Sequence, residues 1–287
     1  MIIDIHNHPD WHGHDLEKYL RNMDTNQIDV TCLLSWECPP QEYDPSFYSK
    51  ALVGNIGPIP FARCLSYVER APERFVLGYA PDPRQPEAID QLKAAIEIHG
   101  VKVCGEIKLR MMYDNPDALR MYRYCGQVQI PVTVHVDYEF EQVSRYPRPS
   151  YWYGGGIDAL ERALRACPQT IFLGHAPGFW AHISDDGLHE RQVYPQGAVV
   201  PGGKLVRMLR TYDNLYCDLS AGSGLNALAR DVVFARDFLL EFQDRVLYGR
   251  DCFDNRLQEF LAGLDLDPVV SESIYSKNAD RLILRRA

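Results

Sequence analysis

The sequence contains no long apolar run. Nowhere do about 18 apolar residues follow one another, which is the length that a membrane-spanning helix needs. We therefore expect no membrane partner. The start of the chain also lacks a charged segment followed by an apolar one, so we expect no signal peptide and a cytoplasmic location.

The chain also has fewer basic than acidic residues. The 30 basic residues face 39 acidic ones, which gives a formal net charge of −9. Nucleic-acid-binding surfaces are usually basic, so this balance argues against a nucleic-acid partner. We expect a small-molecule substrate instead, and the sequence leaves open whether the chain forms a homo-oligomer.

Paired cysteines are missing. Eight cysteines are scattered along the chain, and no Cys-x-x-Cys motif, which would be typical of a zinc or redox site, occurs. Several of them, such as Cys32 and Cys217, lie inside apolar runs. We therefore expect reduced thiols buried in the core of a cytosolic protein.

Short apolar runs alternate with segments of helical period along most of the chain. Eight runs have the composition of buried strands: 2–6, 29–35, 74–80, 101–109, 130–136, 170–176, 214–220 and 245–251. Helical segments lie between most of them, for example 86–100, where Gly100 follows the last apolar position. This alternation predicts an α/β fold of the (β/α)8 TIM-barrel type, and a doubly wound open sheet is the runner-up.

Three connections are long and irregular, at about 35–57, 137–154 and 176–201. Each follows a predicted strand, so in a barrel each would lie over the C-terminal face, where substrates bind. No internal repeat, low-complexity tract or linker interrupts the chain. Residues 1–287 are therefore predicted to form one domain.

A His-x-His pair lies in the first predicted strand. In an extended strand alternate residues share a face, which groups Asp4, His6 and His8 against Ile3 and Ile5. We expect the polar face to look into the barrel and the apolar face to pack against helices. Buried polar groups without partners are costly, and metal binding would give these histidines a partner.

A second His-x-His pair, His12 and His14, follows closely. Pro9 and Gly13 predict a loop here rather than a strand. We expect these histidines above the first pair, either on the substrate side of the site or simply on the surface.

Acidic and histidine side chains recur where later predicted strands end, at Glu106, His135, His175 and Asp251. The C-terminal ends of the strands are where barrels of this type place active sites. A set of histidine nitrogens and carboxylate oxygens suits zinc, with manganese or iron as alternatives, and one or two divalent ions can be held.

Together these motifs resemble the amidohydrolase superfamily, in particular its amidohydrolase-2 branch of TIM-barrel hydrolases and decarboxylases. The resemblance rests on "DIHNH", "GEIKL", "VTVHVD", "FLGHAPG" and "LYGRD" and on the C-terminal "IYSKNADRLI". It implies that His6, His8, His135 and Asp251 are metal ligands, with Asp251 also accepting a proton. It implies that His175 is either a ligand of a second ion or a group that polarises the substrate carbonyl.

Glu106 bears on the number of ions. The resemblance implies that a Gly-Glu strand supplies a bridging carboxylate in binuclear members, whereas mononuclear members often lack it. We expect Glu106 to be a ligand, and the alternative is an ion pair with Lys108. Lys108 can instead bind a substrate carboxylate or, if carbamylated, bridge two ions. Arg110, on the same alternation, can extend a basic strip for an anionic substrate or lie in solvent.

Other loop residues are weaker candidates. Trp180 is predicted to contact substrate, and the remaining aromatics expected at the mouth either wall the substrate or cap the barrel; they are Trp36, Tyr113, Tyr151 and Trp152. His182 and His189 share the third long connection, where solvated histidines are common. Asp218, at the end of the seventh strand, either orients a ligand or caps a helix.

We therefore expect a metal-dependent hydrolase of a small-molecule ester, lactone or amide, in which Asp251 is the general base for metal-activated water. The first alternative is non-oxidative decarboxylation of an aromatic or unsaturated acid on the same site, and Glu106 favours hydrolysis. A further alternative is a non-catalytic metal-binding barrel. A phosphoesterase of the histidinol-phosphatase type is disfavoured, because "GRDCFD" lacks the Asp-x-His pair.

Overall fold

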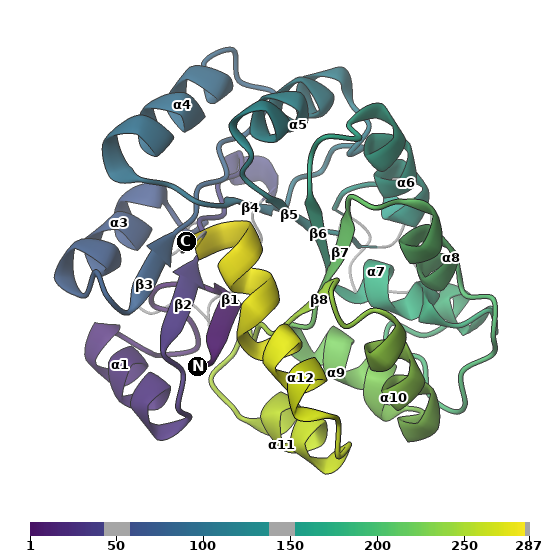
Figure 1. Ribbon diagram of the computed structural model, residues 1–287. Coiled ribbons are helices and arrows are strands. Elements are labelled where there is room, and N and C mark those ends of the chain that lie inside the picture. The colour runs from purple at the N-terminus through teal and green to yellow at the C-terminus, as the bar shows by residue number, and fades with distance from the viewer. Residues whose placement is uncertain (43–57, 138–152, 285–287) are drawn as a thin grey trace.

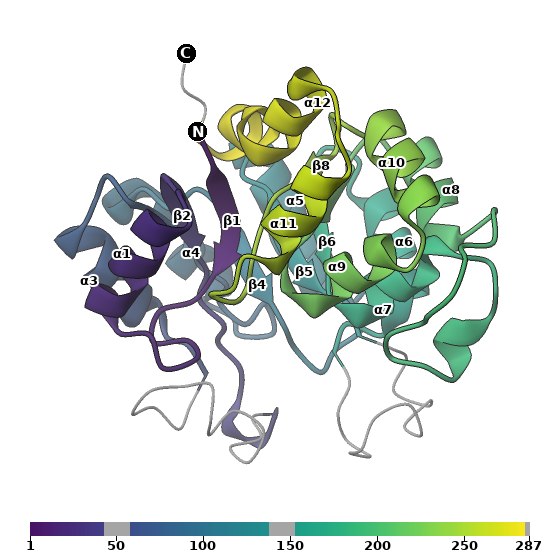
Figure 2. The same ribbon diagram turned by 90° about the horizontal axis from the view of Figure 1, so that it is seen from below.

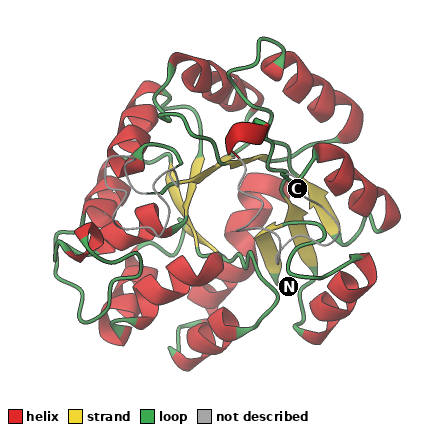
Figure 3. Ribbon diagram, turned by 180° about the vertical axis from the view of Figure 1, so that it is seen from behind, coloured by secondary structure: helices red, strands yellow, loops and turns green. Residues whose placement is uncertain are grey.

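Eight parallel strands follow one another in chain order in the computed structural model, which describes residues 1–42, 58–137 and 153–284. The strands are β1 (Ile3–Asn7), β2 (Val30–Leu33), β3 (Phe75–Leu77), β4 (Cys104–Ile107), β5 (Val132–His135), β6 (Phe172–His175), β7 (Leu215–Asp218) and β8 (Val246–Leu247). Every one overlaps a run that the sequence predicts. Figure 3 shows the strands forming a ring with helices outside it.

Hydrogen bonds close the ring at both seams. Regular pairing gives one sheet of β1-β2-β3 and another of β4 to β8. Between β3 and β4, the Tyr79 amide donates to the Val103 carbonyl at 3.0 Å. Between β8 and β1, the Ile5 amide donates to Tyr248 at 3.1 Å and the Asp251 amide donates to His6 at 2.8 Å. The predicted TIM barrel is thus confirmed, and the open sheet is wrong.

Helices surround the barrel (Figure 1). They are α1 (Leu16–Thr25), α3 (Phe61–Arg70), α4 (Ala88–His99), α5 (Pro116–Val128), α6 (Gly156–Ala166), α7 (Pro177–Trp180), α8 (Lys204–Thr211), α9 (Ala221–Ala229), α10 (Val232–Glu241), α11 (Arg256–Gly263) and α12 (Pro268–Glu272). Local sequence sets several boundaries. Asp15 caps α1 by accepting from the Lys18 amide, and Gly100 ends α4 with a left-handed φ of 72°.

The barrel interior is filled by aliphatic side chains from strands on opposite sides. This cluster includes Ile3 and Ile5 of β1, Leu173 of β6 and Leu247 of β8. Ile283, from the C-terminal helical turns, packs into the same cluster. Figure 2 shows those turns lying at the end of the barrel where β1 begins. That end is therefore plugged, and the other end is left for a site.

The expected orientation of β1 is wrong in its first half. Ile3 and Ile5 point into the barrel, whereas Asp4 reaches Arg250, which in turn donates to Asn22 of the outer helix α1. A register shift in the pairing of β1 with β2 explains the difference, because three steps from Asp4 to Asn7 match two steps on β2. Such a bulge reverses the alternation, so His6 and His8 still face the barrel centre.

The cysteines are free thiols, as predicted. All eight are unpaired, and six of them are buried. Burial raises the pKa of the two partly exposed thiols, Cys38 and Cys252, to about 12, so neither is a thiolate at neutral pH. In the described residues no helix has both the length and the apolar character needed to cross a membrane.

Candidate metal centre

The C-terminal ends of the strands bring together the six residues predicted as ligands. His6 belongs to β1, His8 directly follows that strand, and Asp251 follows β8 across the seam. The other three are Glu106 on β4, His135 on β5 and His175 on β6. Five of the six are buried, and the Asp251 side chain is 15% exposed. Sequence-distant residues thus form one cluster at the end of the barrel where the strands have their C-termini.

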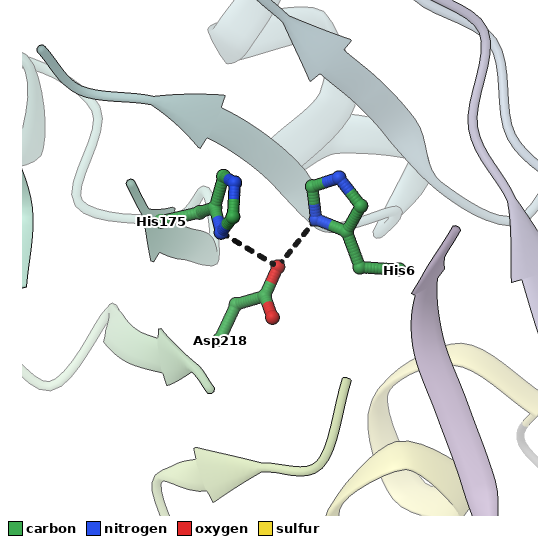
Figure 4. A group of neighbouring side chains, drawn as sticks. All are labelled: His6, His175 and Asp218. Carbon is green, nitrogen blue, oxygen red and sulfur yellow. Dashed lines mark hydrogen bonds and ion pairs between the residues drawn. The ribbon is translucent and has the colours of Figure 1, made fainter. Parts of the chain in front are cut away.

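Three histidines of this cluster are each held by a hydrogen bond at Nδ1. His6 Nδ1 lies 2.6 Å from Asp218 Oδ2, His8 Nδ1 lies 2.8 Å from the Leu34 carbonyl, and His175 Nδ1 lies 2.8 Å from Ser220 Oγ. A carbonyl only accepts, so His8 carries its proton on Nδ1 and offers a lone pair at Nε2. Figure 4 shows Asp218 between His6 and His175. This anchoring turns all three Nε2 atoms toward the centre, as in known metal sites.

Several nitrogen and oxygen atoms in the centre face one another without making good hydrogen bonds, as the ligands of a cation would. His8 Nε2 lies 3.4 Å from Glu106 Oε2 and 3.5 Å from Asp251 Oδ1. His6 Nε2 lies 3.8 Å from Glu106 Oε2 and has no hydrogen-bond partner among the described residues, and neither has Asp251 Oδ1. Buried polar atoms that face one another at such distances fit a shared divalent cation.

His135 is arranged differently. Its Nδ1 lies 2.6 Å from Glu106 Oε1, and its Nε2 lies 3.4 Å from Asp137 Oδ2. Two groups of potential ligands share no residue: His6, His8 and Asp251 form one, and Glu106, His135 and His175 form the other. In each group the donor atoms lie within 4.8 Å of one another. The arrangement therefore accommodates one ion or two.

Burial and neighbouring charges shift the pKa values of Glu106, His6 and His175 in different directions. Burial opposes the ionised form of Glu106, but Lys108 and His135 outweigh it and hold the Glu106 pKa well below its usual range. Burial also opposes charge on His6, yet Asp218 outweighs it and raises the His6 pKa well above 6.5. For His175, burial and the positive charge of His6 lower the pKa well below 6.5. The centre thus combines an ionised carboxylate with a neutral imidazole.

A profile of the amidohydrolase family, Amidohydro_2, matches residues 3–284. The chain belongs to the amidohydrolase family. Its barrel is similar to that of an uncharacterised TIM-barrel protein of Bordetella bronchiseptica, at 16% identity and a TM-score of 0.62 over 98% of this chain and 97% of the other. Among functionally curated proteins, no sequence matches this amidohydrolase.

Two decarboxylases share the barrel as well. A 2,6-dihydroxybenzoate decarboxylase from Rhizobium is 14% identical, with a TM-score of 0.61 over 98% of both chains. A 5-carboxyvanillate decarboxylase from Novosphingobium aromaticivorans, complexed with manganese and 4-hydroxy-3-methoxy-5-nitrobenzoic acid, is 15% identical. Its TM-score is 0.62 over 94% of this chain and 81% of the other. At such low identities the likeness shows a shared fold.

Asp218 has one of the two roles that the sequence left open in this amidohydrolase: it holds the His6 ring, whereas the residue that begins α9 as its N-cap is Ser220. Besides holding His6, it accepts the Ser220 amide on Oδ1 at 2.9 Å, at the start of α9. Ser220, which anchors His175, was not predicted, because a serine two residues after a strand is too common to signal a role. Asp218 could be predicted as a candidate because it stands at the end of a predicted strand.

Replacing Asp218 by asparagine should weaken divalent-metal binding by about 10- to 100-fold, because the amide cannot fix the His6 ring as a carboxylate does. Competition with a chromogenic chelator measures the affinity. The exposed Asp213, five residues earlier and paired with Arg245, offers a matched control. Equal affinities for Asp218→Asn and Asp213→Asn would show that Asp218 does not support the centre.

Lys108, one of the predicted substrate-binding residues, lies close enough to the centre for its charge to lower the pKa of Glu106. Its Nζ lies 4.8 Å from the Trp36 ring centroid and 5.5 Å from that of Tyr153, and the residue is 8% exposed. Arg110 is half-buried; its backbone amide donates to Glu42, and its Nε has no hydrogen-bond partner among the described residues. The substrate-binding roles of Lys108 and Arg110 remain predictions.

Trp180 does not line the mouth, so its prediction as a substrate contact is wrong. It is 1% exposed, its indole nitrogen donates to the Asp218 carbonyl at 2.9 Å, and its ring packs against Phe238. The reason is that residues 177–180 form the short helix α7, which turns the indole into the core. Tyr113 is likewise buried, with its hydroxyl within hydrogen-bond distance of the Ile107 and His135 carbonyls.

The remaining histidines lie outside the centre. His14 stacks on Phe253, with ring centroids 3.7 Å apart, and the exposed His12 lies against Trp11 at 4.8 Å. They form a loop above the first pair, as predicted. His182 and His189 lie together at 4.3 Å, in the turns after α7. Tyr151 and Trp152 lie outside the described residues.

Proposed function

We propose that this amidohydrolase is a metal-dependent hydrolase of a small-molecule ester, lactone or amide. One observation carries the proposal: His6 Nε2 and Asp251 Oδ1 are buried without hydrogen-bond partners among the described residues and belong to the same cluster. A site of this kind combines a place for a cation with a carboxylate that can move a proton.

His6, His8 and Asp251 would hold the cation, with Glu106 and His175 within reach of it. Bound there, a divalent ion would supply an electrophile that polarises a carbonyl and acidifies a water molecule. The mixed nitrogen and oxygen donors favour zinc, with manganese or iron as alternatives. Manganese is bound in a decarboxylase with the same fold, which supports a divalent metal here.

Asp251 would accept a proton from the attacking water and return it to the leaving group. Its Oδ1 and Oδ2 lie 3.5 Å from His8 Nε2 and 3.8 Å from His175 Nε2, so the carboxylate borders the centre on two sides. His175, neutral because its pKa is depressed by burial, would donate from Nε2 to the substrate carbonyl when Ser220 donates its hydroxyl proton to Nδ1. With the opposite tautomer, His175 would be a ligand.

Decarboxylation of an aromatic or unsaturated acid is the second candidate. It is favoured by the decarboxylases with the same fold and by Lys108, whose ammonium group can bind a carboxylate. In that reaction Asp251 or His175 would deliver a proton to the carbon atom from which carbon dioxide leaves.

Reconstitution tests these alternatives. Metal-free protein, prepared with a chelator, is loaded with zinc, manganese or iron(II) and given two panels, one of esters, lactones and amides and one of hydroxybenzoic and unsaturated acids. We expect metal-dependent acid release from the first panel. Carbon dioxide from the second panel would establish decarboxylation instead. Metal binding at one or two equivalents with neither product would favour a non-catalytic barrel.

A further inference from the structure

Asp251 has an unusual backbone conformation. Its φ of 50° lies in the left-handed region, which residues other than glycine rarely adopt. Two hydrogen bonds hold the residue there: its amide donates to the His6 carbonyl at 2.8 Å, and its own carbonyl accepts the Trp11 indole N–H at 2.9 Å. The side chain is thereby directed between His8 and His175.

Trp11 connects this backbone to the first histidine pair. The indole is 8% exposed, and its ring meets the His8 ring edge-on, with centroids 5.2 Å apart at 71°. One side chain therefore contacts both His8 and the residue that carries the nearest carboxylate. The neighbouring His14–Phe253 stack joins the same two loops a second time.

The loop that carries Trp11 is itself anchored. Asp10, just before it, accepts hydrogen bonds from the Tyr67 hydroxyl at 2.9 Å and from Arg63 Nη2 at 2.7 Å, and both partners belong to α3. Asp10 is 7% exposed and also has a left-handed φ, of 57°. The residue next to Trp11 is thus held from α3, independently of the bond between the indole and Asp251.

We propose that Trp11 is a positioning residue: its indole N–H fixes the backbone of Asp251 and so sets the direction in which the Asp251 carboxylate meets a cation beside His8. The inference rests on the proposed function for the role of Asp251 as ligand and base. Trp11 is thus not itself a ligand, but it determines the geometry of the ligands.

Two variants separate the functions of the indole. Trp11→Phe removes the N–H group and keeps an aromatic edge against His8, whereas Trp11→Ala removes both. Cobalt(II) titrated into metal-free protein is the probe, because its visible absorption reports coordination geometry. We expect Trp11→Phe to weaken cobalt binding by about tenfold and to shift the absorption band, with a larger loss for Trp11→Ala.

Turnover supplies the second measurement. With a hydrolysed substrate, Trp11→Phe should lower kcat by about 10- to 100-fold, as expected when a catalytic group is misplaced, and leave KM nearly unchanged. If the wild-type protein hydrolyses nothing in the panel but Trp11→Phe still alters the cobalt spectrum, the positioning role holds and the proposed function fails.

Trp180→Phe is the matched control. It also loses an indole bond to a backbone carbonyl, that of Asp218, but Asp218 stays fixed by its strand pairing with Leu247. It should lower the unfolding midpoint and leave cobalt binding unchanged. If Trp11→Phe behaves in the same way, with a lower midpoint but wild-type cobalt affinity and spectrum, Trp11 has a structural role alone and the inference is overturned.

Discussion

Replacing Asp251 by asparagine should lower kcat by about 10²- to 10⁴-fold, the usual contribution of a general base. The amide keeps an oxygen for the cation but cannot accept a proton, so metal content should fall much less than turnover. Steady-state kinetics at saturating zinc, together with metal analysis of the same sample, separate the two effects.

Asp254→Asn is the control for this variant. Asp254 lies three residues further on, is exposed and pairs with Arg256, so its replacement should leave turnover unchanged. If Asp251→Asn regains wild-type turnover once excess metal is added, Asp251 acts as a ligand alone. The proton acceptor would then have to be another group of the centre, such as Glu106.

Replacing Asp4 by asparagine should destabilise the fold by about 3–5 kcal/mol, because it leaves a buried guanidinium without its counter-charge. Arg250 is 2% exposed and donates to Asp4 from both its backbone amide and its Nε, at 2.9 and 2.8 Å. Urea unfolding followed by circular dichroism measures the change.

Further variants locate the origin of that loss. An Asp4→Leu/Arg250→Met double variant should recover much of the stability, since replacing a whole buried pair by apolar residues is often neutral. The exposed pair of Arg210 and Glu241 supplies the comparison, and Glu241→Gln should change stability far less. A small loss for Asp4→Asn would mean that Arg250 finds another partner.

The sequence was sufficient for the barrel because the signals involved are local. Buried parallel strands are short apolar runs, and the eight runs stand apart from helical segments such as 86–100. The cluster followed from a single geometric rule, that the C-terminal ends of parallel strands meet at one face. Glu106, His135 and His175 could therefore be grouped without knowledge of any contact.

What could not be predicted depends on contacts between distant segments. The bulge in β1 arises from its pairing with β2, so strict alternation misplaced Ile3 and Ile5. In the sequence Trp180 looks like an aromatic residue of a surface loop. It is buried because α7 packs it against the core. The anchoring of His175 by Ser220 joins β6 to the start of α9, and no local pattern marks it.

The seam between β8 and β1 has a consequence for the order of events during synthesis. His6 and His8 leave the ribosome well before Asp251 and the amide that bonds the His6 carbonyl, because β2 to β8 lie between them in the chain. A nascent chain therefore carries an incomplete ligand set until its last strand has joined its first. Metal uptake by this amidohydrolase would then be a late step, and a bound ion would hold the first and last strands of the barrel together.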